Sequence, residues 1–165
     1  SDFEVPQNRR RTIIIGVHKD YEIIPKAIKT VSANNRIPVS TILEDEEDVD
    51  EKYFLTTRAI EGIKKKKERM KLEKKGFGAQ FLDLTKPSYT IPARYWKDGY
   101  DALVKYSDTE IRRLTILELK RIQSFPDDYV ITGSKKDIIM QIGNAVPCRL
   151  GYHLGIYLLD VLEKL

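Results

Sequence analysis

The feature that most constrains the fold is a short β-branched run at residues 12–17, Thr-Ile-Ile-Ile-Gly-Val. An apolar run of this length, ended by the polar residues 18–20, is typical of a strand that is buried on both faces. Such a strand belongs to a sheet that other elements cover from both sides. Residues 25–56 show no sustained periodicity, so no second strand–helix unit follows at once. We therefore expect a mixed α/β fold in which the rest of this sheet lies elsewhere.

The middle of the chain predicts one polar helix. Thr56 and Thr57 are suited to cap a helix that runs to about Lys75 and stops at Gly76. Only four large apolar residues fall within it, so it is expected to face solvent or a phosphate backbone.

Residues 76–106 are expected to be β-rich. Aromatic and branched residues alternate there with glycines and prolines, and Asp98-Gly99 is a hairpin-turn signal. The aromatic residues, with the lysines and arginines among them, fit either a small β-core or a nucleic-acid surface.

From Leu114 onward the pattern turns helical. Thr115 and Glu118 have the spacing of a capping box, and Leu114 and Leu119 have that of a hydrophobic staple. Pro126 is expected to end this helix, and Glu118 is expected to pair with Arg121 one turn later. A final helix after Pro147 carries an apolar stripe, which we interpret as core packing. The stripe consists of Leu150, Leu154, Tyr157, Leu158, Val161, Leu162 and Leu165.

Composition limits the classes of function. The net charge is +4, with seven acids in residues 44–51 and eight lysines or arginines in residues 64–75, a pattern of solvated faces or of a binding surface. One cysteine and two distant histidines predict neither a disulfide nor a metal site. No apolar run approaches the length of a membrane span, and residues 1–4 lack the pattern of a signal peptide. We expect a reducing, intracellular setting, the cytoplasm, and no membrane.

A basic motif precedes the predicted strand. In Gln7-Asn8-Arg9-Arg10-Arg11, Arg9 and Arg11 share one side because successive residues of an extended chain point to opposite faces. Two guanidinium groups on one face suit contacts to phosphates or polar base edges, although a basic loop edge would look the same.

Three segments together resemble conserved blocks of the DNA cytosine-5 methyltransferase family. They are residues 5–11, residues 113–126 and Gln-Ile-Gly-Asn-Ala-Val-Pro at 141–147. The first matches the form Gln-x-Arg-x-Arg followed by a strand, and the last matches at seven positions in order. The middle block departs from the family at Ile116, where proline is common, and at Ser124, where glycine is common. The resemblance covers nearly the whole chain, while its specific motifs occupy about a quarter of it.

The resemblance implies roles for individual residues. Arg9 would lie near the DNA backbone, Arg11 would support the pocket of the flipped cytosine, and Gln7 is counted with both among the DNA-binding residues. Asn144 and Ala145 would help to close the S-adenosylmethionine pocket. The family places its variable target-recognition region between these blocks, and Thr90, Arg94 and Tyr95 are our candidates there for contacts to double-stranded DNA.

The same resemblance shows what is missing from these residues. The Gly-rich cofactor block, the Pro-Cys nucleophile block and the Glu-Asn-Val block do not occur. Cys148 follows a proline but lies inside the last block, and we expect a packed, inert thiol. The chain is therefore expected to be inactive alone and to require an N-terminal catalytic half. That half would be part of the same polypeptide or a separate subunit.

The expected organisation has three parts. Residues 1–25 would end the catalytic domain, residues 26–108 would form the target-recognition domain, and residues 109–165 would form a scaffold helix, the pocket-closing block and a C-terminal helix. The resemblance implies the C-terminal part of an S-adenosylmethionine-dependent methyltransferase fold with a small β-rich recognition domain. The alternative function is a non-catalytic, sequence-specific DNA-binding module. A role in restriction–modification and a regulatory role both fit the sequence.

Overall fold

The computed structural model describes residues 1–21, 26–73, 79–97 and 99–163. These residues contain the α-helices α1 (Thr57–Glu73), α2 (Ile116–Ile122), α3 (Lys135–Asn144) and α4 (Cys148–Leu162). Strands β1 (Leu103–Lys105) and β2 (Ile111–Arg113) pair antiparallel, with Leu103 opposite Arg113. The 3-10 helices are η1 (Ala33–Asn35), η2 (Val39–Ile42), η3 (Glu46–Asp48), η4 (Glu51–Tyr53) and η5 (Ala93–Trp96). The predicted mixed α/β class is confirmed.

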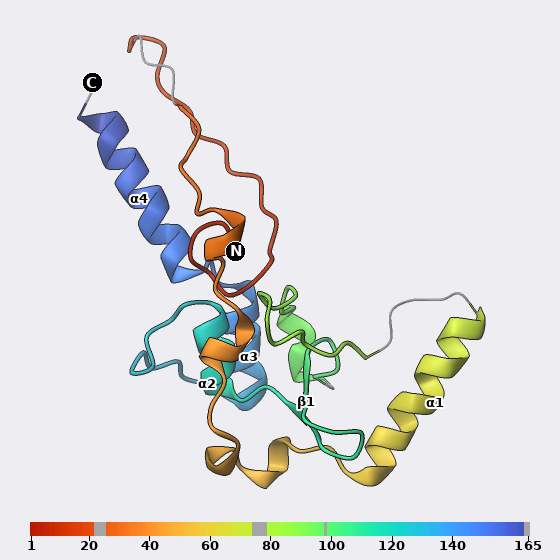
Figure 1. The fold of residues 1–165 in the computed structure, drawn as a ribbon. Helices are drawn as coiled ribbons and strands as arrows, with labels where there is room; N and C mark the ends of the chain where they lie inside the picture. The colour runs from red at the N-terminus through yellow and green to blue at the C-terminus, as the bar shows by residue number, and fades with distance from the viewer. Residues whose placement is uncertain (22–25, 74–78, 98, 164–165) are drawn as a thin grey trace.

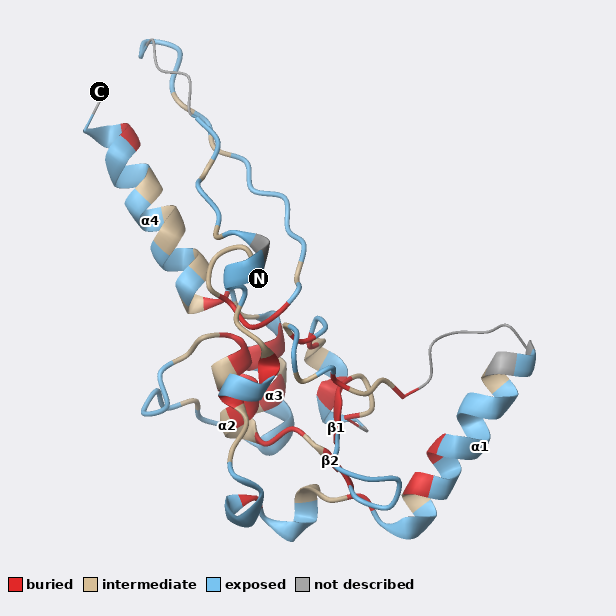
Figure 2. Ribbon diagram, in the orientation of Figure 1, coloured by how far each residue is buried: buried red, intermediate tan, exposed pale blue. Residues whose placement is uncertain are grey.

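The main core lies where α2 and α3 pack against η5, η2 and the strands (Figure 2). Its most buried side chains come from four segments far apart in the chain: Val39, Ile91, Val104, Leu114, Leu119, Ile122 and Ile142. A second, smaller cluster joins the first turns of α1 to the sheet through Ile60, Ile63, Leu103 and Ile111. Beyond those turns α1 stands away from the rest of the molecule (Figure 1).

The predicted caps are present. The Thr115 hydroxyl accepts a hydrogen bond from the Glu118 amide at 3.1 Å, and the Glu118 carboxylate accepts one from the Thr115 amide at 2.8 Å. Leu114 and Leu119 both lie in the main core, as a hydrophobic staple requires. Thr56 caps α1 by accepting a hydrogen bond from the Ala59 amide at 3.3 Å. Gly76, the predicted end of α1, lies outside the described residues.

Helix α2 ends at Ile122, earlier than the expected stop at Pro126. The Phe125 amide donates to the Lys120 carbonyl at 3.0 Å and the Ser124 amide donates to the Arg121 carbonyl at 2.8 Å. These are the two hydrogen bonds of a Schellman motif, which requires a left-handed residue just beyond the helix. Ser124 occupies that position with φ of 56°. Backbone geometry, rather than proline, therefore ends this helix.

The predicted Glu118–Arg121 pair is wrong. Glu118 instead receives two hydrogen bonds of 2.8 Å from the guanidinium of Arg112, and both side chains are 0% exposed. Glu118 also accepts the amide of Glu44 at 3.0 Å. Arg121 lies nearer the surface and pairs with Asp127 at 2.6 Å. The buried pair forms because β2 places a guanidinium directly beside the first turn of α2.

Residues 12–17 do not form the predicted buried strand. They are extended, but Ile13 and Ile14 are exposed, Ile14 at 89%. A strand needs a neighbour that pairs its amides and covers its side chains, and none of the described residues supplies one here. The expectation that the rest of the sheet lies elsewhere is consistent with this exposed segment.

The predicted β-rich region contains little regular β-structure. Its described part, residues 79–97 and 99–106, holds the three-residue strand β1, the helix η5 and an isolated bridge between Phe81 and Leu103. Asp98 of the predicted turn lies outside the described residues. The observed hairpin joins β1 to β2, where the Tyr106 amide donates to the Glu110 carbonyl at 3.0 Å. Isolated backbone hydrogen bonds, such as those from the Leu103 amide to the Gln80 carbonyl and from the Leu82 amide to the Leu103 carbonyl, hold this region in place of long strand ladders.

Helix α4 begins after Pro147 as predicted, but its apolar stripe is not core packing within the described residues. Only Val161 of the stripe is buried, while Leu158 and Leu162 are exposed and Leu165 lies outside the described residues. A second set of exposed apolar residues, Tyr152, Ile156 and Leu159, occupies another face. Helix α4 extends beside residues 9–21 and 26–31 (Figure 1). A cavity between them is lined by Ile13, Ile28 and Tyr157. The described part of the chain contains no helix with both the length and the apolar character to span a bilayer.

Candidate functional site

The N-terminal motif is joined to the segment of residues 88–91. The Asn8 amide donates to the Ser88 carbonyl at 2.8 Å, and the Ser88 amide donates to the Pro6 carbonyl at 2.9 Å. The hydroxyl of Thr90 adds a hydrogen bond to the Asn8 carbonyl at 2.8 Å. Two segments about 80 residues apart in the chain are thereby held in parallel, in a short β-bridge.

Gln7 organises the site from within. Its side chain is fully buried, accepts the Ile91 amide at 3.1 Å and donates to the side chain of Gln123 at 3.2 Å. Gln123 then donates to the Ile142 carbonyl at 2.8 Å, and its own carbonyl accepts the Cys148 amide at 3.0 Å. The side-chain amide of Gln7 is buried and already hydrogen-bonded. Gln7 therefore links these segments structurally and presents no surface that DNA could contact.

Arg9 links the N-terminal motif to the last block. Its Nη1 donates to the Gly143 carbonyl at 2.8 Å and lies 3.5 Å from the Ile91 carbonyl. Partial burial lowers the pKa of Arg9, and the nearby charge of Arg11 lowers it further. A guanidinium remains charged despite such a shift. Arg9 therefore holds two backbone carbonyl groups together at the edge of the site.

Gly143 lets α3 approach the segment of residues 92–93 at backbone contact. A Cβ atom at this position would lie 2.6 Å from the Cα of Ala93 and 2.7 Å from its nitrogen. Real Cβ atoms do not reach such distances from backbone atoms. The glycine of the last block is therefore required by packing, and its carbonyl is free to accept the hydrogen bond from Arg9.

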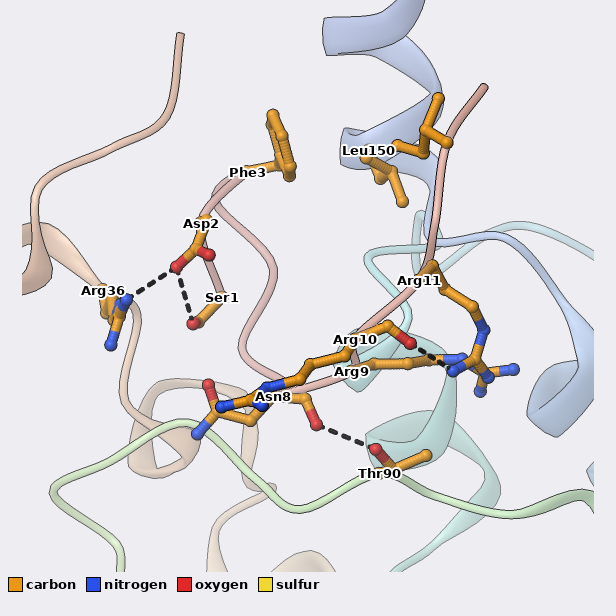
Figure 3. A pocket seen from close by; sticks show the side chains of 11 residues that line it. Ser1, Asp2, Phe3, Asn8, Arg9, Arg10, Arg11, Arg36, Thr90 and Leu150 are labelled. Atoms are coloured by element: carbon orange, nitrogen blue, oxygen red, sulfur yellow. Dashed lines mark hydrogen bonds and ion pairs between the residues drawn. The ribbon is translucent and has the colours of Figure 1, made fainter. Parts of the chain in front are cut away.

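An open cavity of about 980 Å³ lies at this junction and is rich in arginine (Figure 3). Arg9, Arg10 and Arg11 come from the extended N-terminal motif, and Arg36 enters from the loop after η1. Arg36 pairs with Asp2 at 2.8 Å, while Arg11 is exposed and, among the described residues, donates only to the Arg10 carbonyl, at 2.6 Å. A cavity with this excess of guanidinium groups suits a phosphate or a polar base.

The three residues predicted to contact DNA from the central region, Thr90, Arg94 and Tyr95, differ in how far they are exposed. Thr90 lines the cavity, and Arg94 is exposed on η5. Tyr95 is only 3% exposed; its hydroxyl donates to the Ala102 carbonyl at 2.8 Å and accepts the Leu114 amide at 2.9 Å. Burial raises the pKa of Tyr95 well above its ordinary value. The structure thus gives Tyr95 a packing role, because its ring is covered where a base would have to meet it.

Asn144 and Ala145 lie at the carboxyl end of α3, beside Gly143. The Asn144 side chain is exposed and has no hydrogen-bond partner among the described residues. Ala145 is half-buried, and Val146 beyond it is exposed. A free amide, which both donates and accepts, beside a small residue fits the edge of a ligand pocket.

Cys148 is half-buried at the start of α4, and burial raises the pKa of its thiol. A raised thiol pKa lowers the fraction of reactive thiolate, as expected for an inert cysteine. The described residues contain no group of three or more histidine, cysteine or acidic side chains able to hold a metal ion.

Two residues of the site were missed at the sequence level. Gln123 lies within the middle block, four residues after Leu119 on the buried face of α2, and that spacing could have marked it as a buried polar link. Arg36 lies in a loop with no motif around it, so no sequence signal places it in the cavity.

Comparison with known proteins gives consistent matches over this whole region. The sequence model described as C-5 cytosine-specific DNA methylase matches residues 1–158. Type II methyltransferase M1.ScrFI of Lactococcus lactis subsp. cremoris is 30% identical across 99% of this chain and 42% of its own length. Type II methyltransferase M.DsaV of Dactylococcopsis salina is 37% identical across 89% of this chain and 42% of its own length. The chain thus spans about two-fifths of these relatives.

Solved structures show the same fold. The Entamoeba histolytica methyltransferase EhMeth superposes with a TM-score of 0.62 at 19% identity, covering 97% of this chain and 51% of that one. The S. pombe Dnmt2 methyltransferase superposes with a TM-score of 0.60 at 14% identity. At these identities the likeness concerns the fold alone: these residues adopt part of the methyltransferase fold that uses S-adenosylmethionine.

Proposed function

This chain belongs to the C-5 cytosine-specific DNA methylase family, and from that premise we propose that it supplies DNA recognition and one edge of the cofactor pocket to a cytosine-5 methyltransferase. The observation that carries the proposal is the arginine-lined cavity, where the N-terminal motif, the segment of residues 88–91 and the last block meet. Double-stranded DNA is the proposed substrate, and a flipped cytosine is the proposed target.

Within this proposal each cavity residue has one task. Arg11, which is exposed and makes one backbone contact, supports the flipped cytosine. Thr90 and Arg94 meet the duplex from residues 88–97, the recognition segment, while Arg9 fixes that segment to the last block through the carbonyls of Ile91 and Gly143. Gln7 keeps the two segments in register from the buried side. Gln7 and Tyr95 are therefore left out of the proposed DNA contacts.

S-adenosylmethionine is the proposed cofactor, and it would supply the methyl group. The residues present fit one edge of its site. The Asn144 amide is unpartnered among the described residues, and the adjacent Ala145 leaves room beside it. The edge is open to solvent on the side of Val146, so further walls of such a pocket would have to come from outside these residues.

The same proposal includes a catalytic half, in the same polypeptide or in a second subunit. Helix α4 exposes Ile156, Leu159 and Leu162, and the extended residues 12–17 expose Ile14. A helix that is apolar around most of its circumference is typical of the interior of a larger assembly. This observation favours part of an enzyme over a free-standing DNA-binding module. The proposed domain boundaries are 1–25, 26–108 and 109–165.

The proposed cellular context follows from the substrate. An enzyme that methylates DNA would act in the cytoplasm of a bacterial cell. The relatives are named type II methyltransferases, which favours a role in restriction–modification over a regulatory one.

Reconstitution tests the proposal. The chain is mixed with an upstream catalytic half, taken from the region that precedes the match in the Dactylococcopsis salina relative, or is fused to it. Transfer of a radiolabelled methyl group from S-adenosylmethionine to duplex DNA is then measured. We expect transfer only when both parts are present.

A stable complex without transfer, in both the mixed and the fused form, contradicts the proposal. Tight, sequence-selective duplex binding by this chain alone would then support the module instead.

Arg11 and Arg10 provide a matched pair in the reconstituted enzyme. Both are exposed and both line the cavity, but adjacent residues of an extended chain point to opposite sides. We expect Arg11→Ala to lower the rate of methyl transfer on the order of a hundredfold, the usual effect of removing one group that stabilises the reacting centre, with little loss of duplex binding. Arg10→Ala should change transfer and binding together. If Arg11→Ala lowers methyl transfer and duplex binding equally, Arg11 is a phosphate contact with no separate role in the reaction.

A further inference from the structure

The recognition segment lies along α3 in the opposite direction. Ala93 meets Gly143 near the carboxyl end of the helix, and Trp96 meets Lys136 in its first turn, where the Lys136 Nζ lies 4.9 Å from the centre of the indole ring. Seven residues of helix separate these two contacts, which corresponds to about 10 Å along the axis. The surface that begins at the arginine cavity is thus continued along α3 by residues 93–97.

A basic patch occupies the far end of this surface and consists of Arg94, Trp96, Lys97 and Lys136. Trp96 is 37% exposed, and the Lys97 Nζ lies 5.9 Å from its ring centre. Arg94, Lys97 and Lys136 are exposed. The nearby carboxylate of Asp137 is engaged in the α3 capping box, with the Ser134 hydroxyl 2.5 Å away. The patch therefore carries two ammonium groups at an exposed aromatic ring, with the exposed Arg94 two residues before that ring on η5.

Stability alone does not explain this arrangement. A lysine in the first turn of a helix opposes the helix dipole, which costs stability. An exposed cation–π contact stabilises the helix by a similar amount, so the two effects roughly cancel. The indole is only partly covered, so it adds little to the core. Charge complementarity instead indicates an anionic partner that lies across several cations.

We propose that the basic patch binds the phosphate backbone of duplex DNA and extends the contact that starts at Arg11 and Thr90. This inference rests on the proposed function, which brings duplex DNA to the cavity. A surface of about 10 Å along α3 corresponds to roughly three base pairs, at 3.4 Å per phosphate on each strand. The patch would thus secure the duplex flanking the recognised bases. Trp96 positions the ammonium groups of Lys97 and Lys136.

The fluorescence of Trp96 tests this directly, because it is the only tryptophan of the chain. The chain is titrated with a duplex of about 20 base pairs at low salt, and quenching by acrylamide is measured with and without DNA. We expect a changed emission and at least a twofold lower quenching constant at saturating DNA. Unchanged emission and unchanged quenching on a duplex that is bound, as shown by anisotropy of labelled DNA, overturn the inference.

Lys136 and Lys135 provide a matched comparison. They are adjacent in the first turn of α3, but the Lys135 Nζ lies 4.9 Å from the ring of Tyr53, whereas the Lys136 Nζ lies 4.9 Å from the ring of Trp96. We expect Lys136→Gln to reduce the slope of log Kobs against log salt concentration by about 0.9, the value for one lost phosphate contact. Lys97→Gln with Lys136→Gln should reduce it by about twice that amount. Lys135→Gln should leave it unchanged.

The outcomes separate this inference from the proposed function. If the chain, alone or reconstituted, binds duplex DNA and all lysine variants retain the parent slope, only the basic patch is excluded. If neither form binds duplex DNA or transfers a methyl group, both proposals fail together. If Lys135→Gln changes the slope as much as Lys136→Gln, the effect is one of net charge and the patch has no specific role.

Discussion

Gly143 has no room for a side chain, because Ala93 backbone atoms lie within 2.7 Å of where a Cβ would stand. We expect Gly143→Ala to push α3 away from residues 92–93, to weaken the Arg9 hydrogen bond and to lower the free energy of unfolding by about 2–3 kcal/mol, as overpacking does. Urea denaturation measures this. Gly62→Ala in α1 is the control: nothing lies within 4 Å, so alanine should stabilise by about 0.5–1 kcal/mol. Equal effects of the two changes would contradict the close approach.

The Arg112–Glu118 pair predicts a second large effect. Both side chains are fully buried, and the carboxylate also accepts the amides of Thr115 and Glu44. Glu118→Gln would leave the guanidinium without its counter-charge, so the free energy of unfolding should fall by about 3–5 kcal/mol. Asp127→Asn, which removes the partner of the more exposed Arg121, should cost about 1 kcal/mol or less. A small effect at Glu118 would mean that the pair is hydrated.

For single residues, the sequence predicted where the motifs lie better than it predicted what each residue of a motif does. The Gln-x-Arg-x-Arg pattern located the site, but pattern alone treats Gln7, Arg9 and Arg11 alike. The structure separates them, since Gln7 is enclosed, Arg9 binds two carbonyls and Arg11 is exposed. Tyr95 is a similar case, because an aromatic residue in the recognition segment can either pack in the core or make contacts at the surface. Only tertiary packing decides which.

Among the elements, Ser124 joins two helices. Its left-handed backbone closes α2, and its hydroxyl accepts the Arg149 amide at 3.0 Å in the first turn of α4, which has no side-chain cap of its own. We expect Ser124→Ala to lower the free energy of unfolding by about 1 kcal/mol, the usual cost of a lost cap. Ser124→Gly loses the same cap but relieves the backbone, so it should be nearly neutral.

Thermal and urea denaturation of both variants measure the difference. If Ser124→Gly is as unstable as Ser124→Ala, the positive φ carries no strain. If both match the parent chain, the hydroxyl does not cap α4. Glycine is the usual residue here in the family that this chain resembles, and the inter-helix cap offers a physical reason for serine in this chain.

Of the α-helices in the described residues, α1, α2 and α4 were predicted and α3 was not, while β-structure was predicted poorly. The caps of α1 and α2 are local, so Thr56, Thr115 and Glu118 identify them from neighbouring residues. Strand pairing depends on partners far away in the chain or outside it. The β-branched residues 12–17 have strand composition without a partner among the described residues, and residues 79–97 and 99–106 fold through isolated bridges, backbone hydrogen bonds and side-chain hydrogen bonds.

At the scale of the whole molecule, the exposed residues 12–17 and helix α4 lead to a prediction about hydrogen exchange. The amides of residues 12–17 make no ladder hydrogen bonds to any residue that the structure describes, and Ile14 and Leu159 are exposed to solvent. If a catalytic half completes the sheet, these amides gain partners and their exchange with solvent should slow at least about tenfold, since each 1.4 kcal/mol of protection is a factor of ten. Hydrogen exchange of this chain, alone and with the catalytic half, measures this. Exposed residues 107–110 of the hairpin should exchange equally fast in both states. A complex that forms while residues 12–17 remain unprotected would show that the two parts do not share a sheet.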